Sequence, residues 1–186
     1  MNEDVREITD ALKRGNTILY PSDTLWALGC DATNEKAVER IFSIKERPEN
    51  KPFIVLVNSV MMLERYVPEF PEVCYDLIDN SEKPLTIIFD NPDGLPDLIK
   101  GEDGSLGIRI TKDPLCSQII RGLNKPLLST SANKHGKPFP KSFEEIDPVV
   151  IERTDFVLNP PGHRLLNVPS SIIKIGTDSS VKIIRR

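Results

Sequence analysis

Cysteine and histidine are scarce in this sequence. Its 186 residues include three cysteines, Cys30, Cys74 and Cys116, and two histidines. The cysteines are odd in number and widely spaced, which excludes a dense disulfide framework and the short paired spacings of a structural zinc site. We therefore expect three reduced thiols, as in proteins of the cytoplasm.

A long hydrophobic run is also missing. No apolar stretch approaches the roughly 18 residues that a membrane-spanning helix needs. The N-terminal stretch MNEDVREITDALKRG is polar and acidic, and it lacks the apolar core of a secretory signal. We expect a cytoplasmic protein that does not cross a membrane.

Positive charge is in deficit, since the formal net charge is −4. A protein that tracks nucleic-acid phosphates needs several Lys or Arg side chains on one face. The overall charge therefore argues against a general nucleic-acid coat, although it is compatible with a local basic cleft.

Common nucleotide and hydrolase motifs are absent. The sequence contains no P-loop, no GxGxxG, no HExxH and no GxSxG. A bound nucleotide would therefore not be held by one of the familiar glycine-rich loops.

Hydrophobic periodicity predicts helices and strands that alternate in the first half, with strands dominating the end. Helices are expected at 4–14, at 34–46 after an N-cap at Thr33 or Asn34, at 59–79 with an interruption at Pro68 and Pro71, and at 113–122 with a stop at Gly122. Strands are expected at 17–21, 53–57, 85–89, 106–110, 155–158, 170–175 and 181–185, and another begins at 127–128. The polar, proline-containing stretch 134–147 is expected to form a loop that leads to a short helix. This order indicates one α/β domain, residues 1–186, around a mixed, twisted sheet.

A cluster of cations lies between the second helix and the next strand. The stretch KERPENKP contains Lys45, Arg47 and Lys51. Arginine offers a planar fork that fits phosphate or carboxylate, and lysine offers a point charge. Cations at a helix C-terminus also complement the helix dipole. The cluster is therefore either a solvated helix cap or an anion site.

Short hydroxyl side chains gather at the ends of predicted strands. They occur in 22-SDT-24, in 129-STSAN-133 and in 169-PSS-171, and include Thr24, Ser131, Asn133, Ser170 and Ser171. Such groups either satisfy their own backbone in Asx or ST turns or bind a polar ligand. The pattern alone leaves both interpretations open.

Arg109 lies within the apolar run LGIRI. A guanidinium in a buried strand is costly unless a partner compensates its charge. The residue therefore has a structural ion partner, lies on an exposed edge strand, or meets an anionic ligand.

Taken in order, the segments YPSDTLWALGCDA, KERPENKPFIVLV, KPLTIIF, LGIRI, PLLSTSANKHGKP and VPSSIIKI resemble the YrdC/TsaC family of L-threonylcarbamoyladenylate synthases. The resemblance runs from about residue 5 to about residue 175. Its most specific part is the pair Lys45-Glu46-Arg47 and Ser131-Ala132-Asn133. It implies a single YrdC-like domain, without the additional C-terminal domain of longer relatives, whose twisted sheet is flanked by helices around a large concave basic cavity.

The resemblance also implies a role for individual residues. Thr24 and Arg109 match positions that bind L-threonine, and Lys45 and Arg47 match the catalytic pair. The positions that match ATP contacts are Arg47, Lys51, Thr86, Ser131, Asn133, Ser170 and Ser171. No protein side chain is expected to bind a metal, and Mg²⁺ would arrive on the ATP phosphates.

The implied reaction is that of a nucleotidyltransferase. It joins L-threonine, bicarbonate and ATP to give threonylcarbamoyl-AMP and pyrophosphate. A separate transferase complex would then modify position 37 of tRNAs that read ANN codons, and the protein could itself contact tRNA or double-stranded RNA. Two alternatives remain at this point: a non-catalytic RNA-binding module, and a related carbamoyl-transfer enzyme with another acceptor.

Overall fold

A computed structural model describes residues 3–48, 52–163, 165–176 and 180–186. The strands within these ranges are β1 (Ile18–Pro21), β2 (Trp26–Asp31), β3 (Ile54–Val57), β4 (Leu85–Phe89), β5 (Leu106–Ile110), β6 (Leu127–Ser131), β7 (Phe156–Val157), β8 (Ser171–Ile175) and β9 (Val181–Arg185). The α-helices are α1 (Glu3–Lys13), α2 (Glu35–Lys45), α3 (Val60–Glu64), α4 (Val73–Asp79), α5 (Pro114–Leu123) and α6 (Pro148–Arg153). Two short 3₁₀ helices are η1 (Asp97–Ile99) and η2 (Phe143–Glu145).

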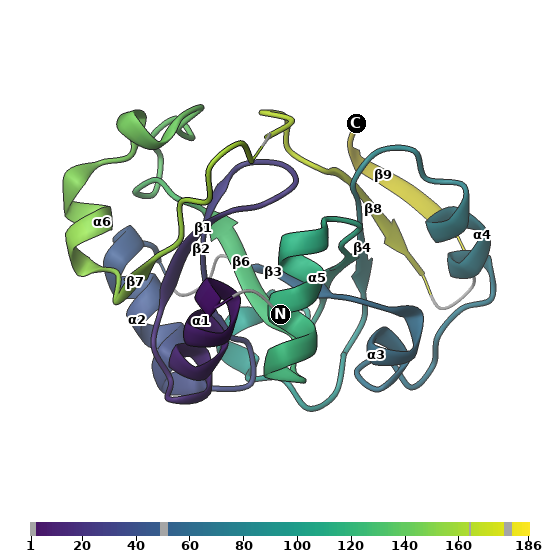
Figure 1. Ribbon diagram of the computed structural model, residues 1–186. Helices are drawn as coiled ribbons and strands as arrows, with labels where there is room; N and C mark the ends of the chain where they lie inside the picture. Colours follow the sequence, from purple (N-terminus) through teal and green to yellow (C-terminus); the bar gives the residue numbers. More distant parts are fainter. Residues whose placement is uncertain (1–2, 49–51, 164, 177–179) are drawn as a thin grey trace.

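All of these strands belong to one sheet, in the order β7-β1-β2-β6-β3-β5-β4-β8-β9. The pairs β1–β7, β3–β5 and β4–β8 are parallel, and the remaining neighbours are antiparallel (Figure 1). The expected mixed sheet in an α/β fold is therefore confirmed. Because non-consecutive strands are neighbours, segments far apart in the sequence meet across the sheet.

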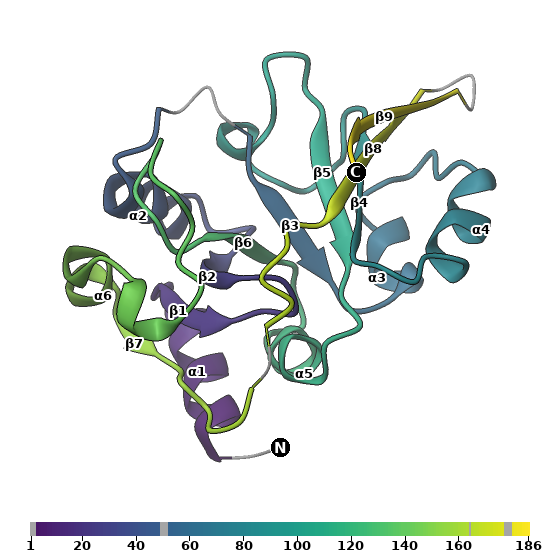
Figure 2. The same cartoon turned by 90° about the horizontal axis from the view of Figure 1, so that it is seen from above.

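Helices cover the central strands and bury them. Helices α1 and α5 contact each other and lie side by side in front of the sheet in Figure 1, which the view from above also shows (Figure 2). The buried face of α1 includes Val5, Ile8, Ala11 and Leu12, which recur at the spacing of one helical face. Every residue of β2 is buried, as expected for a strand covered on both sides.

Helix α2 has the predicted start and a sharp end. Asn34 accepts a hydrogen bond from the backbone N–H of Ala37, which confirms it as the N-cap. Glu46 follows the helix in the left-handed conformation, with φ of +51°. This residue turns the chain away from the helix axis immediately before Arg47.

Two predictions about elements were wrong. The sequence predicted a strand that ends at Pro21 and no strand directly after it, yet residues 26–31 form the buried strand β2, and only residues 22–25 are the loop before it. Helix α5 does not stop at Gly122, because it continues to Leu123 and Asn124 adopts the left-handed C-cap with φ of +57°. The interrupted helix at 59–79 is two helices, α3 and α4, with Pro68 and Pro71 between them.

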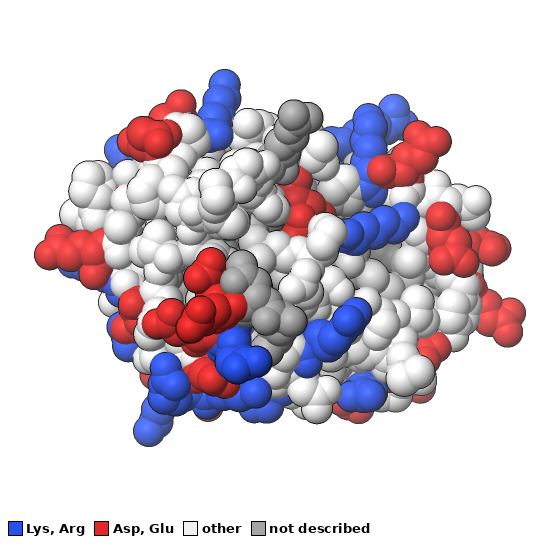
Figure 3. Space-filling view, in the orientation of Figure 1, with Lys and Arg blue, Asp and Glu red and all other residues white. Residues whose placement is uncertain are grey.

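The helices and one face of the surface can be described by their charge and apolar length. Acidic and basic side chains are interspersed on the face that Figure 3 shows. None of the helices in the described ranges is long and apolar enough to span a membrane. The three cysteines are free and buried.

Candidate functional site

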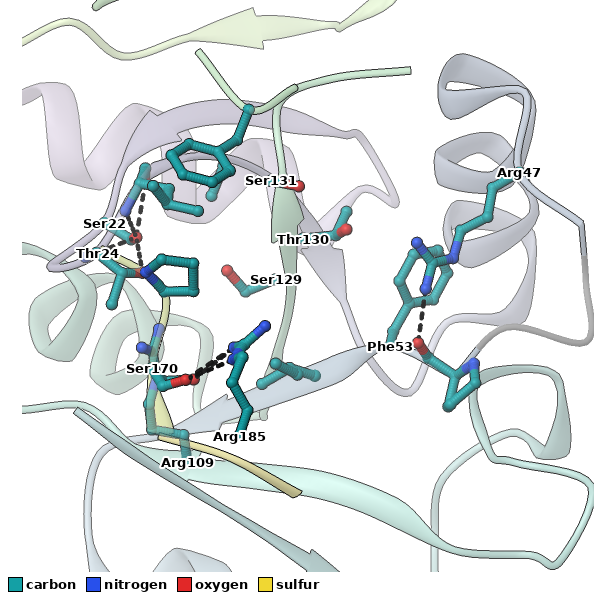
Figure 4. Close-up of a pocket in the computed structure, with 16 residues that line it drawn as sticks. Ser22, Thr24, Arg47, Phe53, Arg109, Ser129, Thr130, Ser131, Ser170 and Arg185 are labelled. Carbon is teal, nitrogen blue, oxygen red and sulfur yellow. Dashed lines mark hydrogen bonds between the residues drawn. The ribbon is translucent and has the colours of Figure 1, made fainter. Parts of the chain in front are cut away.

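A cavity of about 270 Å³ opens between the β1–β2 loop, the start of β3, β5, β6 and the C-terminal strands (Figure 4). It lies near the lower end of the range of about 300–1,000 Å³ that is usual for small-molecule sites. The hydroxyl side chains that line it are Ser22, Thr24, Ser129, Thr130, Ser131 and Ser170. All three hydroxyl clusters noted in the sequence therefore meet at one place.

Three arginines also line this cavity, and each comes from a different part of the chain. Arg47 follows α2, Arg109 lies in β5 and Arg185 lies in β9. In Figure 4, Arg47 is on one side with Phe53, Thr24 and Arg109 are on the other, and Arg185 lies between. Among the described residues, no Asp or Glu lines the cavity. This local excess of positive charge in an acidic protein favours an anionic ligand.

Arg47 is held by its immediate surroundings. Its guanidinium lies 4.7 Å from the centre of the Phe53 ring, and Nη2 donates to the carbonyl oxygen of Pro52 at 2.8 Å. Burial lowers the pKa of Arg47 from its ordinary value. The cation–π contact and the hydrogen bond place the group at the cavity wall before any ligand arrives. Lys51, the third cation of the cluster, lies outside the described residues.

Arg109 is buried and paired with an acid. Its Nη2 lies 3.1 Å from Oδ1 of Asp23, and only 5% of the Arg109 side chain is exposed. The contact is an ion pair without hydrogen-bond geometry, because Oδ1 of Asp23 and Nε of Arg109 are both buried without a hydrogen-bond partner. Desolvation raises the pKa of Asp23, and the charge of Arg109 opposes that rise. Arg109 thus has an ion partner, lines the cavity and keeps an unused donor.

The β1–β2 loop is organised by Ser22. Its hydroxyl donates to the carbonyl oxygen of Leu25 at 2.7 Å and accepts from the backbone N–H groups of Thr24 and Leu25. Ser22 Oγ also lies 3.1 Å from Oγ1 of Thr24. The ST-turn interpretation therefore describes Ser22, and the turn presents Thr24 at the cavity.

Lys45 occupies a different position from the one expected for a catalytic cation. Its Nζ donates to the carbonyl oxygens of Ser131 and Asn133 at 2.5 and 2.6 Å, and 1% of the residue is exposed. It is not among the residues that line the cavity. Burial, and then repulsion from Arg47, lowers its pKa to about 7. Lys45 is thus neither a solvated cap nor a cavity cation, and it ties the end of α2 to the end of β6.

The remaining predicted residues divide between the cavity and its support. Thr86 is completely buried, with its hydroxyl 2.8 Å from that of Ser170, so it lies behind a residue of the cavity wall. Ser171 is half-buried in β8 and does not line the cavity. Asn133 donates to the carbonyl oxygens of Lys134 and Lys137 and borders a neighbouring cavity instead.

Arg185 was not predicted. Its Nε and Nη2 donate to the carbonyl oxygen of Ser170 at 2.9 and 2.8 Å, which fixes its side chain at the cavity. Burial lowers its pKa, and the charge of Arg109 adds to this effect. Nothing in the sequence distinguishes Arg185 from the neighbouring Lys182 and Arg186, because only the pairing of β9 with β8 brings it to Ser170.

A metal site is not evident in the protein itself. Within the described ranges, no group of three or more His, Cys, Asp or Glu side chains could hold a metal ion. The donors that surround the cavity are hydroxyl and guanidinium groups, which suit an anion and not a cation.

Comparison with known proteins places this architecture in a family. A model of the Sua5/YciO/YrdC family, described as telomere recombination, matches residues 10–186. A putative threonylcarbamoyl-AMP synthase of Methanocaldococcus jannaschii is 35% identical over 190 residues, covering 98% of this chain and 88% of the relative. A threonylcarbamoyl-AMP synthase of Stutzerimonas stutzeri is 31% identical, covering 83% of this chain and 84% of the relative.

Solved structures agree with these relatives. P. abyssi Sua5 complexed with L-threonine superposes with a TM-score of 0.82 at 27% identity, over 92% of this chain and 50% of that one. E. coli YciO superposes with a TM-score of 0.83 at 25% identity, over 98% of this chain and 88% of that one. Since the family model spans nearly the whole sequence and the fold is shared, this chain belongs to the Sua5/YciO/YrdC family.

Proposed function

We propose that this protein is an L-threonylcarbamoyladenylate synthase, a nucleotidyltransferase that condenses L-threonine, bicarbonate and ATP. The observation that carries the proposal is the cavity itself, where three arginines and six hydroxyl side chains converge without a lining carboxylate among the described residues. A site of this composition suits a polyanion together with small polar groups. The names of the relatives from M. jannaschii and S. stutzeri support the same activity.

L-Threonine would occupy the side of the cavity that holds Thr24 and Arg109. The guanidinium of Arg109 would attract the carboxylate of the amino acid, and Thr24 lies on the same side of the cavity (Figure 4). The structurally similar protein P. abyssi Sua5 has been crystallised in complex with L-threonine.

ATP would take the rest of the cavity, with its phosphates near Arg47 and Arg185. Ser131 and Ser170 also line this space and can donate hydrogen bonds to phosphate oxygens. Lys51 is retained as an ATP contact in this proposal. Thr86 and Lys45 do not line the cavity and would act through Ser170 and Ser131, which they contact. Asn133 and Ser171 do not line the cavity either.

The chemistry needs positioning and charge neutralisation more than a protein nucleophile. The threonine amine attacks the carbon of bicarbonate, a C–N bond forms, and water leaves to give a carbamate. A carbamate oxygen then attacks the α-phosphorus of ATP, and the bond from that phosphorus to the bridging oxygen breaks, releasing pyrophosphate. Arg47 and Arg185 would compensate the negative charge that the leaving pyrophosphate gathers.

Mg²⁺ would arrive on the ATP phosphates, because the described residues offer no cluster of carboxylates to hold it. The product would pass to a separate transferase that modifies tRNA. A cytoplasmic location fits an ATP-dependent reaction and three unpaired cysteines. We also propose a single domain over residues 1–186, because one sheet contains all the described strands.

One assay tests the activity directly. The purified protein is incubated with ATP, Mg²⁺, labelled bicarbonate and L-threonine, and both pyrophosphate and labelled threonylcarbamoyl-AMP are measured. We expect both products only when L-threonine and bicarbonate are present together. Pyrophosphate release that is independent of L-threonine, or no release over a range of Mg²⁺ concentrations, would contradict the proposal.

A further inference from the structure

A buried tyrosine reaches the cavity wall from the far side of a neighbouring strand. Tyr20 lies in β1 with a completely buried side chain, and its hydroxyl donates to Oγ of Ser129 in β6 at 2.7 Å. Strand β2 lies between β1 and β6 in the sheet. The tyrosine side chain therefore crosses a whole strand to make this single hydrogen bond.

Gly29 provides the space for that crossing. It pairs with Ile18 of β1 on one side and with Ser129 of β6 on the other. A Cβ atom at this position would lie 2.9 Å from Cε1 of Tyr20 and 2.7 Å from the carbonyl oxygen of Leu128. Gly29 does not have a positive φ. Close approach, and not backbone conformation, therefore requires a glycine in the middle of this buried strand.

The hydrogen bond decides which way the Ser129 hydroxyl points. A serine hydroxyl has one hydrogen to donate and two lone pairs that accept. Because Tyr20 occupies an acceptor position of Ser129 Oγ, the Ser129 hydrogen remains to be donated elsewhere. Ser129 lines the cavity together with Thr24 and Arg109. Burial raises the pKa of Tyr20, so the phenol keeps its proton and remains a donor near neutral pH.

We propose that Tyr20 is a positioning residue that sets the Ser129 hydroxyl as a hydrogen-bond donor to the carboxylate or carbamate oxygen of the amino-acid substrate. This inference rests on the proposed function, because it takes its substrate from there. The amino-acid side is favoured because Ser129 lies beside Thr24 and Ser170, whereas Arg47 is across the cavity (Figure 4).

A double-mutant cycle tests the coupling. Tyr20→Phe keeps the ring that fills the space beside Gly29 and removes only the hydroxyl, and Ser129→Ala removes the donor. The dissociation constant for L-threonine is measured by calorimetry without turnover, and KM for L-threonine and for ATP is measured in the synthase assay. Ser129→Ala should weaken L-threonine binding by about tenfold or more, as for the loss of a hydrogen bond to a charged group, and Tyr20→Phe should weaken it by about fivefold. Neither variant should change the affinity for ATP. In the double variant, Tyr20→Phe should add nothing to the effect of Ser129→Ala.

Tyr75→Phe is the matched control, because the Tyr75 hydroxyl donates to Glu64, and neither residue lines the cavity. This variant should change neither the affinity for L-threonine nor the affinity for ATP. The inference is overturned if Tyr20→Phe has its full effect in the Ser129→Ala background. It is also overturned if Tyr20→Phe lowers only the melting temperature.

Failure of the inference is distinguishable from failure of the proposed function. Wild-type protein that binds L-threonine in calorimetry but makes no threonylcarbamoyl-AMP contradicts the synthase activity and leaves the Tyr20–Ser129 coupling measurable by binding alone. A wild-type protein that does not bind L-threonine at all contradicts both. If the wild-type protein makes threonylcarbamoyl-AMP normally, but the effects of Tyr20→Phe and Ser129→Ala on L-threonine affinity are additive, only the inference is contradicted.

Discussion

Arg109 has two environments at once. It forms an ion pair with Asp23 and also lines the cavity, and its Nε is buried without a hydrogen-bond partner. An arginine with no acid nearby would carry the full cost of burial, and a fully paired arginine would have no donor left for a ligand. The incomplete pair with Asp23 meets both requirements.

Arg109→Ala should weaken L-threonine binding, retain ATP binding and lower the free energy of unfolding by about 3 kcal/mol at neutral pH, since it leaves Asp23 buried without a cation. The pKa of Asp23 is already raised by desolvation, and loss of Arg109 raises it further. A folded protein that holds a carboxyl proton more tightly than the unfolded chain loses stability as pH rises. The destabilisation should therefore be smaller at about pH 5 than at pH 7.

Urea unfolding of wild type and variant at both pH values measures this difference in stability. Calorimetry measures the dissociation constants for L-threonine and for ATP. An equal loss of L-threonine and ATP binding would contradict the division of the cavity. A destabilisation that grows as pH falls would contradict the account of Asp23.

Arg47 is expected to act on the nucleotide and not on the fold. It is half-buried at the cavity wall, where it stacks on Phe53. Arg47→Ala should lower kcat/KM for ATP by about 30-fold or more, as for the loss of hydrogen bonds to a charged group, without a large change in melting temperature. Arg47→Lys should recover only part of the loss, because a point charge replaces a planar fork.

Steady-state kinetics and thermal unfolding of the same preparations test this prediction. Arg121→Ala, at an exposed position of α5, is the control and should behave as wild type. If Arg47→Ala unfolds instead, the arginine is structural and its assignment to ATP is wrong.

At the scale of elements, four contacts join the C-terminal end of α2 to the end of β6 and the segment that follows it. Lys45 donates to Ser131 and Asn133, and its own carbonyl oxygen accepts from the backbone N–H of His135 at 2.8 Å. Glu46 forms an ion pair with Lys134 at 3.0 Å. The two ends that carry Arg47 and Ser131 to the cavity are thus held as one unit.

Lys45→Met should lower the free energy of unfolding by about 1–3 kcal/mol, because two buried carbonyl oxygens lose their donor. The pKa of Lys45 is lowered to about 7. Between about pH 7 and pH 10 the unfolded chain therefore binds a proton that the folded protein has lost, so this residue makes the protein more stable as pH rises. The difference in unfolding free energy between wild type and Lys45→Met should grow over that range.

The matched control is Lys36→Met, since Lys36 is exposed on the same helix. Urea unfolding at several pH values provides the measurement. A difference that stays constant or shrinks with rising pH would show that Lys45 does not titrate in this way. Equal destabilisation by Lys36→Met would show that the buried contacts contribute nothing particular.

At the scale of the whole molecule, the sheet order creates the cavity. The β1–β2 loop, β5, β6 and β9 are distant in sequence, yet together they contribute Thr24, Arg109, Ser129 and Arg185 to one space. The net charge is −4, and both signs of charge are interspersed on the face in Figure 3. We therefore expect the cavity arginines to provide most of the attraction for an anionic ligand.

Because that attraction is electrostatic, KM for ATP should rise several-fold when KCl increases from about 0.05 M to about 0.5 M, as salt screens the arginines. KM for L-threonine should change less, since a zwitterion has no net charge and Arg109 is buried. Kinetics at constant free Mg²⁺ separate the two effects. A larger salt effect on L-threonine than on ATP would contradict the proposed placement of the ligands.

Much of the fold could be predicted because periodicity is local. The faces of α1 and α2, the Asn34 cap and most strands follow from neighbouring residues. Strand β2 was missed because the polar residues 22–24 obscured the buried run after them, and its Gly29 has a meaning only beside Tyr20. The hydroxyl clusters, Arg47 and Arg109 could be identified from residue type, whereas Arg185 could not.

By itself, the sequence determined the class of fold, the absence of a glycine-rich nucleotide loop, and the residue types available to hold an anion. Only the tertiary structure decided their use. It turned Lys45 toward backbone carbonyls, paired Arg109 with Asp23, brought Arg185 to Ser170, and passed Tyr20 over Gly29 to Ser129. The reason is that a side chain's chemistry is local, whereas its partner depends on which strands become neighbours, and pairing between distant strands is not recorded in local periodicity.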